Sequence, residues 1–127
     1  MEKIKLLLIE DDLKVVQDFK MYLESAIPNL EMQTAKFLEE IREKLEIDYD
    51  CIILDGELGD CGGIEVLEIM SEDQRKITIL HSGNYGFVHN NKEIVFSGYL
   101  KRFASTQKNI TMRNITEDIK KLALNLQ

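Results

Sequence analysis

Short apolar runs alternate along this chain with stretches in which apolar residues recur at steps of three and four. Uninterrupted apolar positions, as in residues 51–54 (CIIL), are typical of strands buried on both faces of a parallel sheet. A weaker apolar–polar alternation at Leu30 and Met32 predicts a short edge strand. The expected strands are residues 4–9, the segment around Leu30 and Met32, and residues 51–54, 77–80 and 97–101.

The segments between these runs have the spacing of amphipathic helices. Pro28 ends the first of them, because proline cannot continue a helix. The last expected helix begins near Asn114, where Glu117 three residues later makes a variant of the capping box. Residues 84–96 have only weak periodicity. The expected apolar stripes are Val16, Phe19, Leu23 and Ile27; Phe37, Ile41 and Leu45; Ile64, Leu67 and Met70; and Ile119, Leu122 and Leu126.

The alternation of strands and helices predicts an α/β fold, with a parallel sheet and helices on both of its faces. At 127 residues, the chain has the length of one domain with a core of its own. Sheets of this kind bind ligands at the carboxyl ends of their strands, close to a switch in strand order. Polar residues at those ends are therefore the first candidates for a functional site.

Composition predicts a soluble protein of the cytoplasm. The chain is 44% hydrophobic and 31% charged, and none of its apolar runs approaches the roughly 18 residues that a membrane helix needs. Acidic residues follow the first apolar run at once, which is not the pattern of a secretory signal. We expect the two cysteines, Cys51 and Cys61, to be free thiols in a reducing compartment.

Charge is unevenly distributed along the chain, and the net charge is −7. Residues 1–73 carry 7 Lys/Arg and 20 Asp/Glu, whereas residues 74–127 carry 9 and 3. The acidic half argues against a protein that coats nucleic acid. The basic half could face an acidic partner, but a solvated surface is the simpler interpretation.

Acidic residues and one hydroxyl follow three of the predicted strands. Glu10 and Asp11 come after the first apolar run, Asp55 comes after residues 51–54, and Ser82 comes after the run at 77–80. In a parallel sheet these positions meet at one edge, where the carboxylates would repel one another by several kcal/mol, on the order of 4 for a close pair. The spacing therefore predicts a cation site or raised pKa values, and oxygen ligands of this kind suit Mg²⁺.

Other interpretations apply to parts of this set. Acidic residues also favour the start of a helix, so Asp12 is equally well explained as a helix cap. That interpretation does not account for Asp55, because a long loop (DGELGDCGG) precedes the next expected helix. Zinc is disfavoured because the sequence has no evident Cys/His cluster. We expect His81 to be packed or hydrogen-bonded rather than to bind a metal.

Together these motifs resemble the receiver domain of response regulators in two-component signalling, the chemotaxis receiver in particular. The matching stretches are LLLIEDD, DYDCIILDGELGDCGGIEVL, ITILHSG and SGYLKRF, in this order and over nearly the whole chain. The resemblance implies a flavodoxin-like, doubly wound sheet of five parallel strands in the order 2-1-3-4-5 with helices on both faces. It also implies one receiver domain over residues 1–127, with no output domain.

The resemblance implies a role for each polar residue. Asp55 matches the phosphoacceptor, and Ser82 matches the hydroxyl that binds the phosphoryl group. Tyr99 matches the aromatic residue that moves together with that hydroxyl. The lysine of the family is matched by Lys101 if one residue is deleted from the comparison, or by Arg102 without a gap. The magnesium ligands would be Glu10, Asp11, Asp55 and the main-chain carbonyl of Glu57.

Two departures from the family affect the loops around this site. Gly59 stands where the family has a proline, and Arg102 follows Lys101 where the family has a proline after its lysine. The residues that would receive a phosphoryl group thus match the family, whereas the surface that would pass on the signal is altered.

We expect a stand-alone response regulator that accepts a phosphoryl group on Asp55 in a Mg²⁺-dependent reaction. Its donor would be a histidine kinase or a phosphotransfer protein and its target another protein, with no nucleic acid or membrane involved. The main alternative is a receiver-like binding module that is not phosphorylated. A phosphatase with an aspartate nucleophile would need Asp-x-Asp where the chain has Glu10-Asp11-Asp12, and a flavin protein would need a glycine- and hydroxyl-rich loop there. We therefore expect a signalling protein and not an enzyme.

Overall fold

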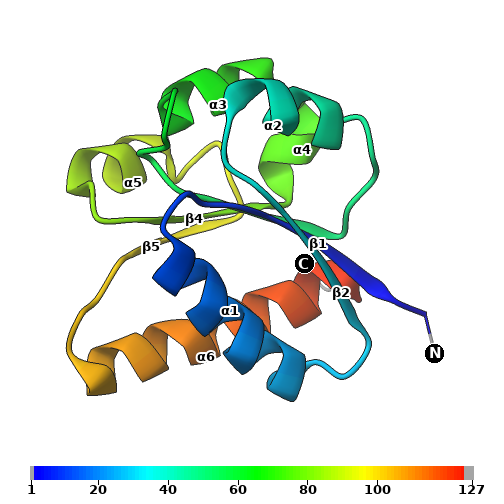
Figure 1. The fold of residues 1–127 in the computed structure, drawn as a ribbon, viewed down its shortest axis with the longest axis vertical. Helices are drawn as coiled ribbons and strands as arrows, with labels where there is room; N and C mark the ends of the chain where they lie inside the picture. Colours follow the sequence, from blue (N-terminus) through cyan, green and yellow to red (C-terminus); the bar gives the residue numbers. More distant parts are fainter. Residues whose placement is uncertain (1, 125–127) are drawn as a thin grey trace.

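The computed structural model describes residues 2–124, which form one five-stranded sheet with helices on both of its faces (Figure 1). The strands are β1 (Ile4–Ile9), β2 (Leu30–Ala35), β3 (Cys51–Leu54), β4 (Thr78–Ser82) and β5 (Ser97–Leu100). The helices are α1 (Leu13–Ala26), α2 (Leu38–Lys44), α3 (Gly63–Ile69), α4 (Glu72–Lys76), α5 (Tyr85–Asn91) and α6 (Ser105–Ala123).

The strands are all parallel and lie in the order β2-β1-β3-β4-β5. This order confirms the predicted flavodoxin-like, doubly wound topology. From β1, the chain first adds β2 on one side and then returns to add β3 on the other. The strand order therefore reverses between β1 and β3, and the carboxyl ends of these two strands flank the position where such sheets bind ligands.

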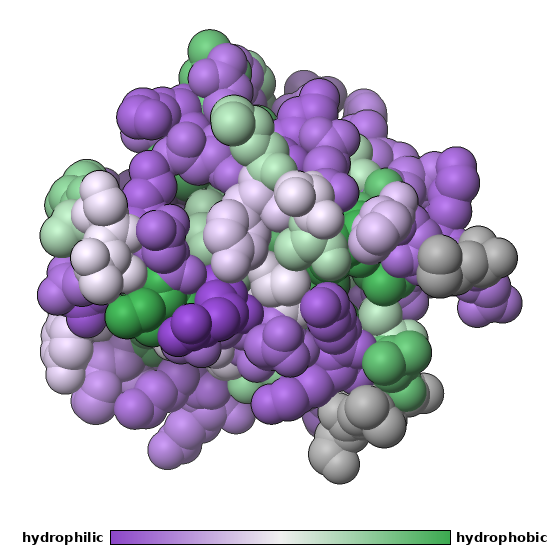
Figure 2. Space-filling model, turned by 90° about the horizontal axis from the view of Figure 1, so that it is seen from below, coloured by the Kyte–Doolittle hydropathy of each residue, from purple (hydrophilic) through white to green (hydrophobic). Residues whose placement is uncertain are grey.

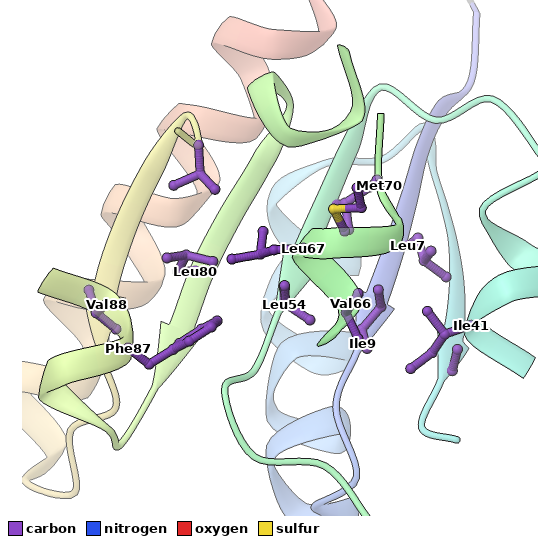
Figure 3. Close-up of a cluster of buried hydrophobic side chains, with 13 residues drawn as sticks. Leu7, Ile9, Ile41, Leu54, Val66, Leu67, Met70, Leu80, Phe87 and Val88 are labelled. Carbon is purple, nitrogen blue, oxygen red and sulfur yellow. The ribbon is translucent and has the colours of Figure 1, made fainter. Parts of the chain in front are cut away.

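Alternate side chains of each strand face opposite layers of helices. In β1, Leu7 and Ile9 pack with α2, α3 and α5, whereas Leu6 and Leu8 pack with α1 and α6. Figure 3 shows the first of these clusters, in which side chains of β1, β3 and β4 meet those of the helices that cover them. From the side of α1 and α6, the surface is mostly hydrophilic, with hydrophobic residues in small separate areas (Figure 2). Each face of the sheet thus has a core of its own.

Helix α1 agrees with the prediction from its apolar spacing. Phe19 and Leu23 are buried, and the helix ends just before Pro28. Asp12 is the N-cap, because its Oδ1 accepts hydrogen bonds from the backbone N–H groups two and three residues later, at 2.9 and 3.4 Å. The interpretation of Asp12 as a helix cap is therefore confirmed.

The last helix is longer than predicted. Helix α6 begins at Ser105 and not near Asn114, which is an exposed residue inside it and so is not its cap. The first turn of α6 is entirely polar, and the buried apolar residues begin only with Met112. The prediction failed because periodicity detects a helix only where the helix covers a core. Of the predicted stripe, Ile119 and Leu122 are buried, and Leu126 lies outside the described residues.

Three details of the middle of the chain were not predicted. The weakly periodic segment 84–96 contains α5, whose N-cap Asn84 accepts a hydrogen bond from the N–H of Phe87 at 3.0 Å. Helix α4 escaped prediction because its residues, EDQRK, include none that is apolar. The prediction that Phe37 and Ile64 belong to buried apolar stripes is wrong. Phe37 is the N-cap of α2 and is 46% exposed, and Ile64 lies in the first turn of α3 and is 48% exposed.

The two cysteines agree with their prediction as free thiols, with Cys51 buried in β3 and Cys61 half-buried. Within residues 2–124, the helices are too short or too polar to cross a bilayer.

Substitutions at two residues of α3 test which face of this helix packs against the sheet. We expect Leu67→Ala to lower the free energy of unfolding by about 2–5 kcal/mol, because Leu67 is only 4% exposed and its loss leaves a cavity. Ile64→Ala on the same helix should change it by less than about 0.5 kcal/mol. Urea denaturation followed by circular dichroism measures both values. Equal losses in the two variants would contradict the position of α3.

Candidate functional site

Three carboxylates lie together at the carboxyl edge of the sheet. Glu10 and Asp11 follow β1, Asp55 follows β3, and one oxygen of each lies within 4.8 Å of the others. Sheet hydrogen bonding continues past both strand ends, since the N–H of Glu10 donates to the carbonyl of Ala35 at 3.1 Å and that of Asp55 to Ile9 at 3.0 Å. The parallel sheet therefore brings the three residues to one place, as their positions in the sequence predict.

Lys101 is the cation of this acid cluster. Its ammonium nitrogen lies 3.0 Å from Oε1 of Glu10 and 3.0 Å from Oδ2 of Asp55. The end of β4 positions this residue, because the backbone N–H of Lys101 donates to the carbonyl of Ser82 at 2.9 Å. Of the two basic residues that could match the lysine of the family, the structure thus brings Lys101 to the carboxylates, while Arg102 is exposed.

The three charged side chains are largely shielded from water. The side chains of Glu10, Asp55 and Lys101 are 1%, 5% and 17% exposed. Charges removed from water are stable only when they are paired, so each carboxylate depends on the same ammonium group. Two acids facing one base leave one negative charge in excess, which a bound proton or a second cation would remove.

Glu10 is the carboxyl group whose surroundings favour such a proton. Its burial and the neighbouring charge of Asp55 raise its pKa from 4.5 to about 7, against the opposing effect of Lys101. Its second oxygen, Oε2, accepts hydrogen bonds from the backbone N–H groups of Asp11 at 3.1 Å and Asp12 at 3.2 Å. Burial by itself would lower the pKa of Lys101, but its two carboxylate partners raise that pKa above the usual value.

The donor set of the acid cluster fits Mg²⁺. The candidate ligand atoms are all carboxylate oxygens, two from buried residues and one from the exposed Asp11. Hard oxygen ligands with access to water are what Mg²⁺ requires. In the described part of the chain, no other group of three or more His, Cys, Asp or Glu side chains is arranged to hold a metal. A cation here would offset the same excess charge that raises the pKa of Glu10.

Ser82 lies on the neighbouring strand at the same edge of the sheet. It is buried, and its Oγ accepts a hydrogen bond from the N–H of Asn84 at 3.1 Å. A Cβ on Gly56 would lie 2.8 Å from this Oγ and 2.6 Å from the ring of Phe87, so the loop after Asp55 reaches the end of β4 only with glycine there. Spacing alone did not single out Gly56; the one signal was a glycine directly after a strand-end aspartate.

Glu57 belongs to the loop that leaves this site, and its side chain is exposed. Two backbone hydrogen bonds within residues 56–63, of 2.8 and 3.0 Å, close the loop. A closed loop holds its main chain in one shape beside Asp55, as a carbonyl ligand requires. The role of the Glu57 carbonyl as a metal ligand stays a prediction.

Tyr99 lies on the face of the sheet opposite to Ser82. Its hydroxyl donates a hydrogen bond to Oδ2 of Asp118 in α6, and its ring packs in the core under α1 and α6. Ser82 instead pairs in register with Leu100, which belongs to the other core. Side chains alternate along a strand, so residues two positions apart leave it on the same face. Tyr99 and Lys101 therefore share the face that is covered by α1 and α6.

Burial and the charge of Asp118 raise the pKa of the Tyr99 hydroxyl to about 12, so it stays a neutral donor. The expected movement of Tyr99 together with Ser82 stays a prediction. Such a movement would first have to break the hydrogen bond to Asp118.

Many solved structures that resemble this one are receiver domains of response regulators. The phosphorylated cyanobacterial phytochrome response regulator RcpA has a TM-score of 0.78 at 22% identity, over 91% of this chain and 92% of its own. The receiver domain of Francisella response regulator 1452 has a TM-score of 0.77 at 18% identity, over 98% and 100%. TrrA from Thermotoga maritima, in complex with Mg²⁺-BeF, has a TM-score of 0.74 at 22% identity, over 94% and 98%.

No family model and no curated protein sequence matches the chain. At the identities given above, the structural likeness establishes the fold. The chain has the fold of a response-regulator receiver domain, as the resemblance of its motifs implies.

The raised pKa of Glu10 predicts how stability depends on pH when no metal is bound. The folded protein keeps the Glu10 proton up to about pH 7, whereas the unfolded chain releases it near 4.5. Unfolding therefore releases a proton between these values, so the stabilisation is complete below about pH 4.5 and is lost as the pH rises toward 7. We expect Glu10→Gln to remove this part of the pH dependence.

Urea denaturation at about pH 5 and about pH 7.5 in the presence of a chelator measures the effect. Glu24→Gln, at an exposed position of α1, is the control and should keep the wild-type dependence. If Glu10→Gln also kept it, Glu10 would be ionised in the folded protein across this range, contrary to its burial.

Proposed function

We propose that this protein is a signalling receiver that accepts a phosphoryl group on Asp55. The proposal rests on one observation above all: Lys101 pairs with Asp55 and Glu10 at the carboxyl edge of a receiver fold, with Asp11 beside them. The same arrangement that neutralises a carboxylate before the reaction would neutralise a phosphoryl group after it.

Asp55 would act as the nucleophile. Its Oδ2 pairs with Lys101, which leaves Oδ1 to attack phosphorus. A bond forms between this oxygen and phosphorus while the bond from phosphorus to the donor nitrogen breaks, and the electron pair stays on the donor imidazole. Lys101 would remain beside the product and pair with one of the phosphoryl oxygens.

Ser82 would donate its hydroxyl hydrogen to another phosphoryl oxygen. Its Oγ already accepts a hydrogen bond from Asn84, and that bond does not use the hydroxyl hydrogen. Asn84 is also the N-cap of α5. A new bond at Ser82 would therefore act on the start of α5, which is how a local charge change can bias a neighbouring element.

Mg²⁺ is the cofactor that we propose for this site, held by Glu10, Asp11, Asp55 and the main-chain carbonyl of Glu57. When bound, it neutralises charge on the oxygens of the transferred group. Glu10 has to be ionised to act as a ligand, directly or through water. Metal binding would therefore release the proton that its raised pKa retains, and loading should improve as the pH rises toward 7.

A histidine kinase or a phosphotransfer protein would be the donor, and a second protein would be the target, both in the cytoplasm. The receiver fold and the carboxylates at its edge support this choice of donor. The chain's own chemistry would be limited to gaining and losing the phosphoryl group, so we propose a signalling protein and not an enzyme. Neither nucleic acid nor a membrane is proposed as a partner.

A receiver-like binding module that is not phosphorylated is the second candidate. It is favoured by Tyr99, whose hydroxyl is bound to Asp118 on the face away from Ser82. In such a module, Lys101 would be the permanent counter-ion of Glu10 and Asp55, and the protein would bind its partner in one state.

Intact mass after incubation with acetyl phosphate separates the two candidates. We expect wild type to gain one phosphoryl group with Mg²⁺ and none without it, and Asp55→Asn to gain none. Asp60→Asn changes an exposed carboxylate of the same loop and should be modified as wild type. A gain in Asp55→Asn would contradict the assigned acceptor. No gain in wild type, together with NMR spectra unchanged by beryllofluoride, would favour the binding module.

The choice between the two neighbouring basic residues has a separate test. We expect Lys101→Met to reduce the rate of phosphorylation by at least about tenfold, because it leaves two buried carboxylates without their counter-ion and the phosphoryl group without a partner. Arg102→Met should stay within about twofold of wild type, since Arg102 is exposed. The rates come from a time course of intact mass. The opposite ranking would assign the role to Arg102.

A further inference from the structure

A cavity of about 130 Å³ lies against Lys101 on the side of α1 and α6. It is lined by the end of β4, the loop from β5 into α6, the N-cap of α1, and the first two turns of α1 and α6. Val15 and Met112 supply apolar walls, and His81 is a buried residue of the lining. Arg102 and Phe103 are exposed and mark the mouth. Of the residues that line this cavity, the proposed phosphoryl transfer uses only Lys101.

His81 is the unexplained polar group of the lining. It is only 7% exposed and packs edge-on against Phe19, with 5.0 Å between the ring centres. Its Nδ1 is enclosed and has no hydrogen-bond partner among residues 2–124. Because this nitrogen is enclosed, a ligand in the cavity can contact only the other ring nitrogen, Nε2.

The protonation of His81 determines what it can offer a ligand. Burial and the charge of Lys101 lower its pKa to about 4, so the ring is neutral and carries a single N–H. If the enclosed Nδ1 carried that hydrogen, a buried donor would be left unpaired. With the hydrogen on Nε2 instead, Nδ1 is an enclosed acceptor without a partner, and the imidazole has one N–H to donate to an acceptor in the cavity.

Arg102 is the cation of the lining that remains without an acidic partner in the described part of the chain. Lys101 already pairs with the carboxylates of the acid cluster, and Lys14 and Lys108 both pair with Asp18. A guanidinium group binds a carboxylate through two parallel hydrogen bonds, which makes arginine the residue suited to recognise one. A ligand carboxylate at the mouth would supply the partner that Arg102 lacks. It would have to lie on the side of the cavity away from the acidic Asp12, which therefore limits the gain from this ion pair.

The volume limits the body of the ligand to about one ring. A cavity of roughly 150 Å³ in another protein binds benzene, so the cavity beside Lys101 has room for one six-membered ring. A ring held between Val15 and Met112 would have one end at the buried His81 and the other at the exposed Arg102.

We propose that this cavity binds a small aromatic carboxylate that carries a hydroxyl group at the far end of its ring. The ring packs against Val15 and Met112, the hydroxyl oxygen accepts a hydrogen bond from His81, and the carboxylate pairs with Arg102 at the mouth. This binding does not require phosphorylation of Asp55.

The test is an NMR titration of the metal-free protein with 4-hydroxybenzoate. Saturable shifts are expected for the imidazole C–H groups of His81 and the methyl groups of Val15. Benzoate, which lacks the hydroxyl, should bind roughly three- to tenfold more weakly, as expected for one hydrogen bond. 4-Hydroxybenzamide, which lacks the charge, should bind roughly two- to fivefold more weakly, as expected for one exposed ion pair.

Three variants assign these preferences to residues. His81→Phe keeps an aromatic ring against Phe19 and should lose the preference for 4-hydroxybenzoate over benzoate. Arg102→Met should lose the preference over the amide. Arg113→Met, which changes an exposed arginine of α6 outside the cavity lining, is the matched control and should bind as wild type.

Three results would each overturn the proposal: no saturable shift at millimolar 4-hydroxybenzoate, equal affinity for the three compounds, or shifts centred away from His81 and Val15. Because Arg102→Met changes a surface side chain, the comparison with Arg113→Met decides the outcome even if His81→Phe does not fold.

Discussion

The ion pair of Lys101 with Glu10 and Asp55 is the constraint on which the carboxyl edge of the sheet depends. The parallel strands force two carboxylates together where water hardly reaches them, and one ammonium group 3.0 Å from each makes this tolerable. The arrangement still carries one negative charge in excess. That charge explains both the raised pKa of Glu10 and the fit of the acid cluster to a divalent cation, because a proton and a metal ion are two ways to remove it.

The fold was predictable to the extent that apolar residues report it. Strand β3 and residues 6–9 of β1 are buried on both faces, so they leave uninterrupted apolar runs, and α1 shows a buried stripe at Phe19 and Leu23. Helix α6 shows one only from Met112 onward, because its first turn is polar. Helix α4 shows none, since it depends on a capping box in which Ser71 and Gln74 exchange hydrogen bonds of 2.9 and 3.1 Å.

The sequence predicted which residues lie at the site, but not which way their side chains point. A parallel sheet brings the carboxyl ends of β1, β3 and β4 to one edge, so the positions of Asp55, just after β3, and Ser82, at the end of β4, indicate that they are neighbours. Lys101 and Arg102 both have long side chains, so their length does not show which one contacts the carboxylates. The backbone hydrogen bond from Lys101 to Ser82 positions Lys101 for this contact. The same register turns Tyr99 toward α6. The requirement for glycine at position 56 comes from packing against Phe87, which no spacing along the chain reveals.

One side chain links the acid cluster to the cavity under it. Tyr99 and Lys101 follow each other at alternate positions, so both leave the sheet on the side of α1 and α6, and Lys101 then reaches over the edge to the carboxylates. A ligand in the cavity would contact the stem of Lys101, and a phosphoryl group on Asp55 would contact its ammonium group. Coupling between two such events is reciprocal. If the ligand changes the equilibrium constant for phosphorylation of Asp55 by some factor, phosphorylation changes the affinity for the ligand by the same factor.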